Sequence, residues 1–239
     1  MALNGYRDLN VRSSAPSIAE VVRRIITSRP ILLDFICMDV VNYSALARKI
    51  REEVSSLLGK NVSVDAIKMA LIRFTEKACS NREEMISKVK RIIEKSSIEL
   101  KSDIAVVTIR KEAVLINIDG IARLAARARF FQMAQGLRSF TIALSKEDLP
   151  DLIALVGKES VEDLQLNQVA LLIVSPTEII STPGVIAYLT NLMAFNGINI
   201  THIVSCYRDT IIVVKREDAL RAYEVIERAL KSLSESSLS

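Results

Sequence analysis

The sequence predicts an α+β protein in which an all-helical N-terminal domain precedes two tandem βαββαβ units. Apolar residues recur at helical spacing in roughly the first 96 residues, whereas after that point they alternate or run in short branched stretches typical of strands. The order of strands and helices then occurs twice, as expected for two-layer sandwiches. We therefore expect domains over residues 1–96, 97–166 and 167–239.

The helices of the first domain have recognisable ends. Ser17 is suited to cap the first helix and Ser63 the fourth, and either Asn42 or Ser44 begins the third. Gly59 occupies the position of a left-handed C-cap. The last helix is highly charged and is expected to be a connector. The expected helices are Ile18–Ser28, Ile31–Met38, Ala45–Leu58, Val64–Ala78 and Asn81–Glu94.

The two later units have the same predicted element order, a ferredoxin-like one. The second lacks a closing strand after Leu230, and we expect the spare strand Ile98–Lys101 to take that place. The first unit comprises strands Ser97–Lys101 and Ile104–Arg110, helix Asn117–Arg129, strands Phe130–Gln135 and Leu137–Leu144, helix Lys146–Val156 and strand Val161–Leu166. The second comprises strand Gln168–Ser175, helix Pro183–Asn196, strands Ile198–Cys206 and Thr210–Val214, and helix Glu217–Leu230.

Two turns of the second unit carry a family resemblance. Thr182-Pro183-Gly184-Val185 opens its first helix, and Gly197-Ile198-Asn199-Ile200 leads into the next strand. With this element order, the second unit resembles an ACT domain. The resemblance implies that both turns lie close together at a domain edge, where an amino acid binds across an interface with another ACT domain.

The residues of these turns suit such a ligand. Gly184 allows close approach of the backbone, free N–H groups at a helix start favour a carboxylate, and Asn199 offers a donor and an acceptor. The alternative is that the two turns only start and stop a helix. The ligand-binding residues that the resemblance implies are Ser181, Thr182, Pro183, Gly184, Val185, Asn199, Ile200 and Thr201.

The first unit matches by element order only, because its junction 111–114 lacks Pro-Gly. We interpret it as a degenerate ACT domain that packs against the second. Tandem pairs of this kind resemble the regulatory region of aspartokinases, in which one ACT domain is inserted into the other. The resemblance implies a homo-oligomer, such as a homodimer, formed through ACT domains. We expect residues 1–96, read as helices, not to form the aspartokinase catalytic domain.

The N-terminal domain is basic, since residues 1–97 hold 17 Lys and Arg against 11 Asp and Glu. Residues 44–75 resemble a helix-turn-helix or winged-helix domain, with the helix from Val64 reading DNA. The alternative is a helical dimerisation module with a solvated basic face. The candidate DNA contacts are Arg48, Lys49, Lys60, Lys68 and Arg73.

Other classes of site and location are disfavoured. The single histidine, His202, lies four residues from Cys206 on a predicted strand, too far to share a metal, so we expect no metal, cofactor or catalytic site. Three widely spaced cysteines predict free thiols in a reducing compartment, the cytoplasm. No apolar run approaches the roughly 18 residues of a membrane span, and residues 1–8 do not resemble a signal peptide. The absence of Trp and the abundance of Ile suit a thermophile.

The sequence therefore predicts a non-enzymatic regulatory protein. Its tandem ACT domains bind an amino acid and pass the signal to the N-terminal domain, which acts as a transcription regulator. The alternative is a regulatory subunit that never binds DNA and docks on an enzyme of amino-acid metabolism.

Overall fold

The computed structural model describes residues 16–235, apart from the side chains of residues 77, 81 and 232–235. The chain divides after residue 84 into two compact parts, which we call the helical unit and the sheet unit. The expectation about a signal peptide concerns residues 1–8, which lie outside the described range. Within that range, no helix combines the length and the apolar character that crossing a membrane requires.

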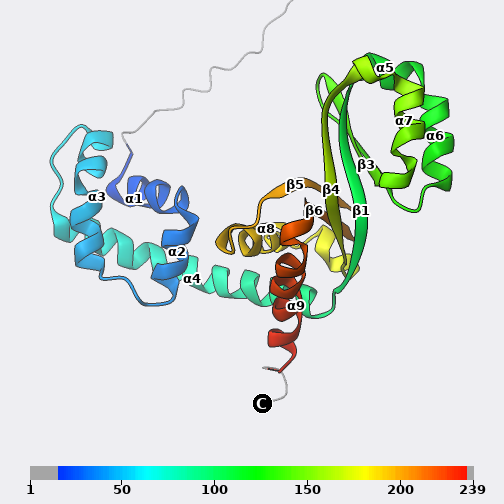
Figure 1. Cartoon of the computed structure of the whole chain (residues 1–239). Coiled ribbons are helices and arrows are strands. Elements are labelled where there is room, and N and C mark those ends of the chain that lie inside the picture. Colours follow the sequence, from blue (N-terminus) through cyan, green and yellow to red (C-terminus); the bar gives the residue numbers. More distant parts are fainter. Residues whose placement is uncertain (1–15, 236–239) are drawn as a thin grey trace, which may run out of the picture. The chain divides into compact units, whose positions relative to one another are not determined.

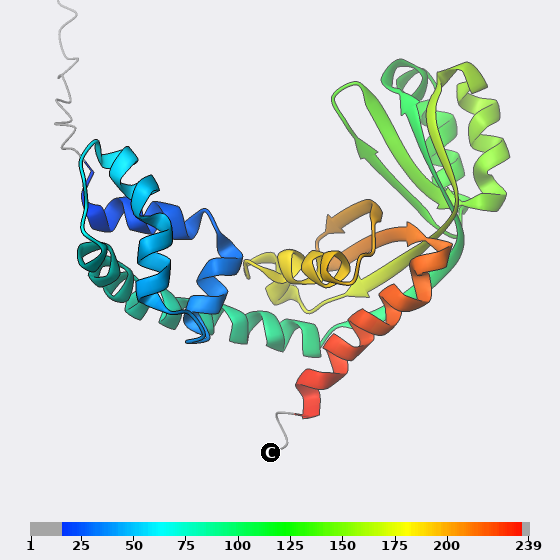
Figure 2. The ribbon, with the colours of Figure 1, turned by 60° about the vertical axis from the view of Figure 1, so that its left-hand side comes forward.

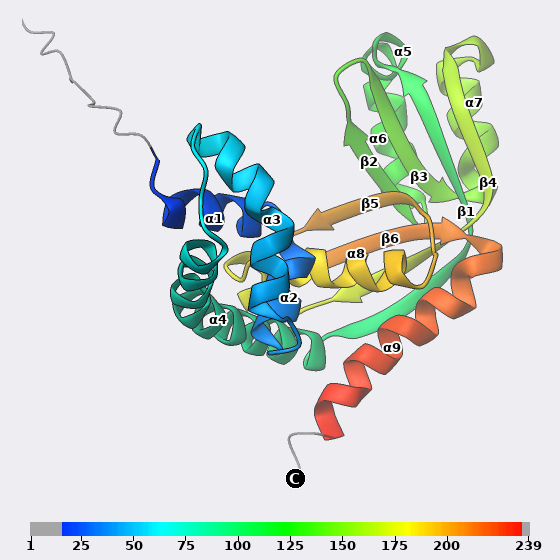
Figure 3. The same ribbon diagram turned by 90° about the vertical axis from the view of Figure 1, so that its left-hand side faces the viewer.

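The helical unit begins its helices where the sequence predicts. The N–H of Glu20 donates to Ser17 Oγ (3.2 Å), and that of Ala66 donates to Ser63 Oγ (3.2 Å). Asn42, rather than Ser44, caps the third helix, and Gly59 ends it at φ +63°. Figure 3 shows these helices side by side. They are α1 (Ile18–Thr27), α2 (Pro30–Cys37), α3 (Tyr43–Leu58) and the first part of α4 (Val64–Glu94).

Helix α4 and its cysteine differ from the sequence prediction. The structure contains one helix of 31 residues where two were expected, because no Gly or Pro interrupts the chain between Ala78 and Asn81. Cys37 on α2 and Cys79 on α4 form a disulfide, so the prediction of free thiols is wrong for both. Their sequence spacing gave no indication of this pairing, which depends on how α2 packs against α4. Cys206 is free and exposed.

The sheet unit contains an antiparallel sheet in the order β2-β3-β1-β4-β6-β5. Its two central strands, β1 and β4, have 14 residues each and pair from Ser97↔Val174 to Ile109↔Val161. Figure 1 shows both running from one end of the unit to the other. The strands are β1 (Ser97–Arg110), β2 (Phe131–Gln135), β3 (Ser139–Ser145), β4 (Val161–Val174), β5 (Ile200–Cys206) and β6 (Asp209–Lys215).

The two long strands divide the sheet into two βαββαβ halves. Residues 104–167 form one half, which we call the inserted half, and residues 97–101 with 168–235 form the other, the closing half. The strand Ile98–Lys101 pairs with β4 from Ile173 to Ala170, so it supplies the missing strand of the closing half, as predicted. The predicted class, a helical region followed by an α+β pair of such units, is confirmed.

Each long strand changes direction at a single residue. Asp103 and Asn167 both have φ of 56°, and the register of the β1–β4 pair shifts beside Asp103. Asp and Asn tolerate this left-handed conformation better than other residues that have a side chain. The sequence analysis placed a strand end at each of these residues, whereas the structure continues the strand through a bulge.

Helices cover the outer face of each half (Figure 2), and each half has its own core. The inserted half packs α6 and α7 on its strands, and the closing half packs α8, α9 and the end of α4. A small apolar cluster that includes Ile104, Val106, Ala170 and Val213 joins the halves on the face away from the helices. The helices are α5 (Lys111–Ile116), α6 (Ile118–Arg127), α7 (Leu149–Val156), α8 (Val185–Phe195) and α9 (Ala219–Glu235).

An internal repeat follows the strands β3 and β6, which each have seven residues. Lys146-Glu147-Asp148 forms a 3₁₀ turn before α7, and Arg216-Glu217-Asp218 forms one before α9. Arg216 also pairs with Asp103, the bulge residue of β1 (3.0 Å). The two halves therefore share a local motif that the periodicity of the sequence did not reveal.

Reduction of the Cys37–Cys79 disulfide should destabilise the helical unit. The bond closes a loop across 42 positions, and chain entropy assigns such a loop roughly 4 kcal/mol. We expect Cys37→Ser, or added dithiothreitol, to lower the denaturant midpoint of the helical transition. Cys206→Ser is the matched control and should leave it unchanged. Equal midpoints for oxidised and reduced protein would contradict the prediction.

Candidate functional site

The segment between β4 and α8 contains the predicted Pro-Gly turn. Gly184 has φ of +98°, a conformation in which a residue with a Cβ is strained, and its ideal Cβ position lies 3.4 Å from Val89 Cγ2. Helix α8 begins at Val185, and no side chain caps it. The backbone N–H groups of its first turn therefore lack the side-chain partner that Ser17, Asn42 and Ser63 give to other helices.

Two hydroxyl groups lie just before this turn. The 3₁₀ turn Thr177–Ile180 precedes them, and both donate to the carbonyl oxygen of Glu178. Thr182 Oγ1 lies 2.8 Å from that oxygen, and Ser181 Oγ lies 3.4 Å from it. Each hydroxyl group already donates its hydrogen to Glu178. Its oxygen can therefore only accept a hydrogen bond from a ligand.

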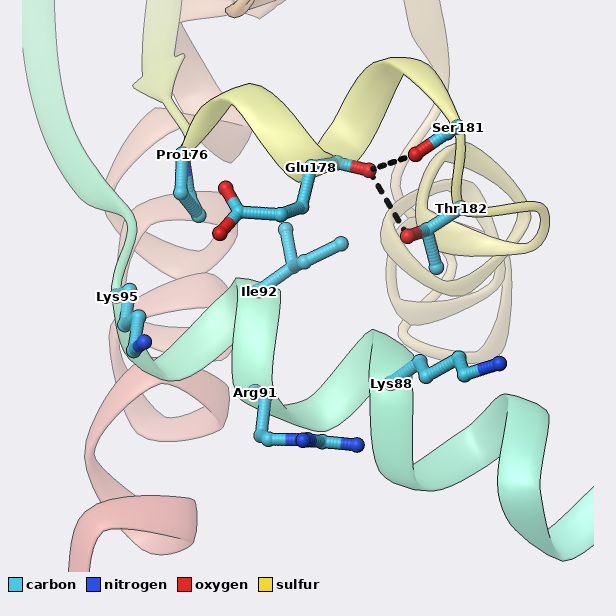
Figure 4. A pocket seen from close by; sticks show the side chains of 8 residues that line it. All are labelled: Lys88, Arg91, Ile92, Lys95, Pro176, Glu178, Ser181 and Thr182. Carbon is cyan, nitrogen blue, oxygen red and sulfur yellow. Dashed lines mark hydrogen bonds between the residues drawn. The ribbon is translucent and has the colours of Figure 1, made fainter.

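Two cavities flank this segment, and Thr182 lines both. The first, which we call the turn cavity, has a volume of about 420 Å³ and lies at the start of α8. It is lined by Ile179, Ile180, residues 182–187, Ser205 and Tyr207. The second, the basic cavity, has a volume of about 360 Å³ and lies against the end of α4 (Figure 4). It is lined by Lys88, Arg91, Ile92, Lys95, Pro176, Glu178, Ser181 and Thr182.

The turn cavity is mainly apolar with a few polar groups. Ile180 is 59% exposed and Tyr207 71% exposed, so both offer apolar surface at its mouth. Tyr207 has φ of 55°, which is uncommon for a bulky residue and holds the β5–β6 turn in a special geometry. Ser205 supplies a hydroxyl group. The sequence analysis missed Ser205 and Tyr207, because only the pairing of β5 with β6 brings their turn to the start of α8.

The other predicted ligand residues lie at the opposite end of α8. Eleven residues of helix, about 16 Å, separate the Pro-Gly turn from the chain that leads to Asn199. Asn199 is exposed, and Ile200 packs against the core of the closing half. Thr201 Oγ1 donates to Gln168 Oε1 (2.8 Å) and so has a structural partner. Within one chain the structure therefore brings together residues 181–185 but not residues 199–201.

His202 lies on β5 opposite Val213, on the face of the sheet that the helices do not cover. Its Nε2 is buried and has no hydrogen-bond partner among the described residues. Burial lowers the pKa of the imidazole, because removal from water disfavours the charged form. It lines neither cavity, and the described residues contain no group of three or more His, Cys, Asp or Glu that would suit a metal ion.

The basic residues predicted to contact DNA belong to α3, α4 and the loop between these helices. Arg48, Lys49, Lys60 and Arg73 are exposed, Lys68 is half-buried, and none makes an ion pair with a described residue. Residues 16–94 contain no strand, so the described part of the helical unit has no β wing. The role of these five residues stays a prediction.

The model of the ACT domain family matches residues 163–228. This span contains the closing half from β4 to α9, and the resemblance of this region to an ACT domain is therefore confirmed. Among curated proteins, none matches this chain.

The solved structures to which this chain is similar include aspartate kinases. The Clostridium acetobutylicum enzyme is 17% identical over 57% of this chain and 34% of its own, with a TM-score of 0.47. The aspartate kinase regulatory subunit of Thermus thermophilus is 22% identical over 56% of this chain and 98% of its own, with a TM-score of 0.43. The Synechocystis aspartate kinase is 18% identical over 57% of this chain and 27% of its own, with a TM-score of 0.46. This chain thus spans about a third of the length of the Clostridium enzyme.

The stability of the protein should fall at mildly acidic pH because of His202. Its lowered pKa means that the folded state prefers the neutral imidazole, whereas the unfolded chain takes up a proton as pH falls through about 6.5. Unfolding is therefore favoured below that pH. We expect the loss of unfolding free energy between pH about 7.5 and about 5.5 to be smaller in His202→Gln. Denaturant titrations at both values test this, and equal losses would contradict it.

Proposed function

We propose that this chain is a non-catalytic regulatory protein that binds an amino acid in the turn cavity. The observation that carries the proposal is the uncapped start of α8 beside Gly184, in a region that matches the ACT domain family. The α-carboxylate would accept from the N–H groups of the first helical turn. The ammonium group would donate to Thr182 Oγ1, whose hydrogen is already used by Glu178. The ligand side chain would face Ile180 and Tyr207.

A second copy of the chain would complete this site. Residues 199–201 lie at the far end of α8, so they reach a ligand beside Gly184 only from a neighbouring molecule. Asn199 is exposed and therefore accessible to such a neighbour. We propose a homodimer formed through the closing halves, in which Asn199 of one copy contacts the ligand held by the other.

Helix α4 is the proposed route by which binding reaches the helical unit. It contributes Ile67 and Leu71 to the core of that unit, and Val89, Ile92 and Ile93 to the core of the closing half. Its side chains also lie beside the Pro-Gly turn, where Val89 Cγ2 is 3.4 Å from the position that a Cβ would occupy on Gly184. The ligand would stabilise one arrangement of the dimer and so shift the population of states of the helical units.

Two outputs follow from this arrangement. As a transcription regulator, the helical unit would bind DNA through the five unpaired basic residues of α3, α4 and their connecting loop. As a regulatory subunit, it would dock on an enzyme of amino-acid metabolism without DNA. We also propose that the protein is cytoplasmic and comes from a thermophile. The Cys37–Cys79 disulfide is compatible with this location, because intracellular proteins of hyperthermophiles are an exception to the rarity of disulfides in the cytosol.

A thermal-shift screen of the twenty amino acids tests the ligand proposal. A ligand at 100 times its Kd stabilises the folded state by about 2.7 kcal/mol, which raises Tm by roughly 5–10 °C. We expect Thr182→Val and Asn199→Ala to remove most of the shift. Thr190→Val is the matched control, because Thr190 also donates to a helix carbonyl but lines neither cavity. No shift with any amino acid, or an equal loss in the control, would refute the proposal.

If the helical unit binds DNA, its affinity for DNA should fall steeply as the salt concentration rises. Each phosphate contact contributes a slope of about −0.9 to log K against log salt. We expect the double variant Arg48→Gln/Lys49→Gln to lower both affinity and slope in an anisotropy titration with duplex DNA. Lys158→Gln, a charge removed from the sheet unit, is the control. If no DNA binding is detected at low salt, docking on an enzyme remains as the proposed role of the helical unit.

A further inference from the structure

Helix α2 is apolar on every side, but only one of its sides packs against the rest of the helical unit. Asp34 is its one charged residue. Leu32, Leu33 and Ile36 lie in or against the core of the helical unit. A helix that is apolar all round is normally buried all round. The opposite side of α2 therefore has a composition that suits a contact, and no described residue provides one.

This opposite side carries four large apolar residues. Ile31, Phe35 and Met38 follow at intervals of four and three positions, so they share one side of the helix. The N–H of Val40 donates to the carbonyl oxygen of Phe35 (3.3 Å), in a turn that brings the side chains of these two positions together. Their exposed fractions, in chain order, are 56%, 49%, 67% and 65%. We call these four residues the α2 face.

Two links to α4 hold the other side of α2 in place. Cys37 forms the disulfide with Cys79, and Asp34 Oδ1 pairs with Arg82 (2.6 Å). The α2 face is therefore presented by a helix that is fixed at two points. Binding through such a face loses little conformational entropy, because the helix is already ordered.

The area of the α2 face matches what a dimer interface requires. The exposed parts of its four residues amount to roughly 400 Å² of mainly apolar surface per copy. A standard interface buries about 800 Å² per partner, of which a little more than half is apolar. The α2 face thus supplies most of the apolar area of such an interface.

The order of residues along the α2 face makes it complementary to itself. A two-fold contact requires one surface to match a second copy of that surface. If two α2 helices pack antiparallel with Phe35 near the axis, Ile31 of each copy lies opposite Met38 of the other. Apolar residues then meet apolar residues along the whole contact.

The charges beside the α2 face favour the same antiparallel arrangement. Arg29 precedes the helix and Asp39 follows it, so each lies near the other residue of the second copy. Asp39 makes no ion pair with a described residue. Arg29 pairs with Glu53 (2.7 Å) and still has further N–H donors to offer. Antiparallel helices also bring the positive end of one dipole to the negative end of the other.

We propose that the α2 face is a contact between two copies of this chain, in which two α2 helices pack antiparallel across a two-fold axis near Phe35. The contact lies in the helical unit and is separate from the dimer proposed through the closing halves. It does not depend on the amino-acid site of the turn cavity.

Photo-crosslinking of the full-length protein tests the inference. The variant Phe35→p-benzoylphenylalanine keeps an aromatic ring at the centre of the α2 face. A mixture of isotope-labelled and unlabelled chains shows by mass spectrometry which crosslinks join two copies. We expect crosslinks from residue 35 to residues 29–40 of a second copy. The same replacement at Leu137, which is 89% exposed on the inserted half, is the control and should give no crosslink to that segment.

Charge variants in the crosslinking chain test the orientation. Met38→Lys and Ile31→Glu should each lower the yield of crosslinked dimer about tenfold, because each places a charge against an apolar residue of the other copy. An equal mixture of the two variants should restore the yield, since the introduced charges are then opposite in sign across the axis. Unchanged circular dichroism of both variants shows that they are folded.

Three outcomes would overturn the inference. The first is that residue 35 gives no crosslink between copies, or crosslinks only within its own chain, to residues 1–15 or to the sheet unit. The second is a crosslink to a different segment of the second copy. The third is a mixture of charge variants that does not recover the yield. The thermal-shift screen reports on the proposed function separately, because Met38 and Ile31 line neither cavity.

Discussion

Strands β1 and β4 pair along nearly their whole length, and this pairing determines where the other elements of the sheet unit lie. Each strand gives one end to the inserted half and the other end to the closing half. The bends at Asp103 and Asn167 separate the two ends without breaking the strands. Helices can then cover both halves on their outer faces, while a small apolar cluster joins the halves on the inner face.

The two cavities result from the same arrangement. Because β4 ends at Val174 and β5–β6 turns back beside it, the segment from Pro176 to Gly184 is held between Tyr207 on one side and α4 on the other. One short segment therefore serves two cavities of different chemistry. Thr182 lines both cavities.

Local signals predicted much of the fold. Ser17, Ser63 and Gly59 act within one turn of the backbone, and their roles follow from residue type alone. The prediction failed where the structure depends on contacts between segments that are distant in the sequence. Asp103 and Asn167 look like strand ends because the residues that favour turns also favour bulges. The Cys37–Cys79 bond and the basic cavity depend on packing of α4 against other elements, and neither has a signature in residue spacing. The Pro-Gly turn was found because its sequence resembles the turn that opens the first helix of ACT domains.

The position of the strand at residues 97–101 has a consequence for the growing chain. During synthesis this segment leaves the ribosome before the inserted half, but its partner on β4 follows only after that half is complete. All strands of the inserted half are available once residue 167 has emerged. The inserted half can therefore fold first and present a twisted pair of strands, on which the later residues assemble. Pairing between segments so distant in sequence is slow, and a preformed pair shortens the remaining search.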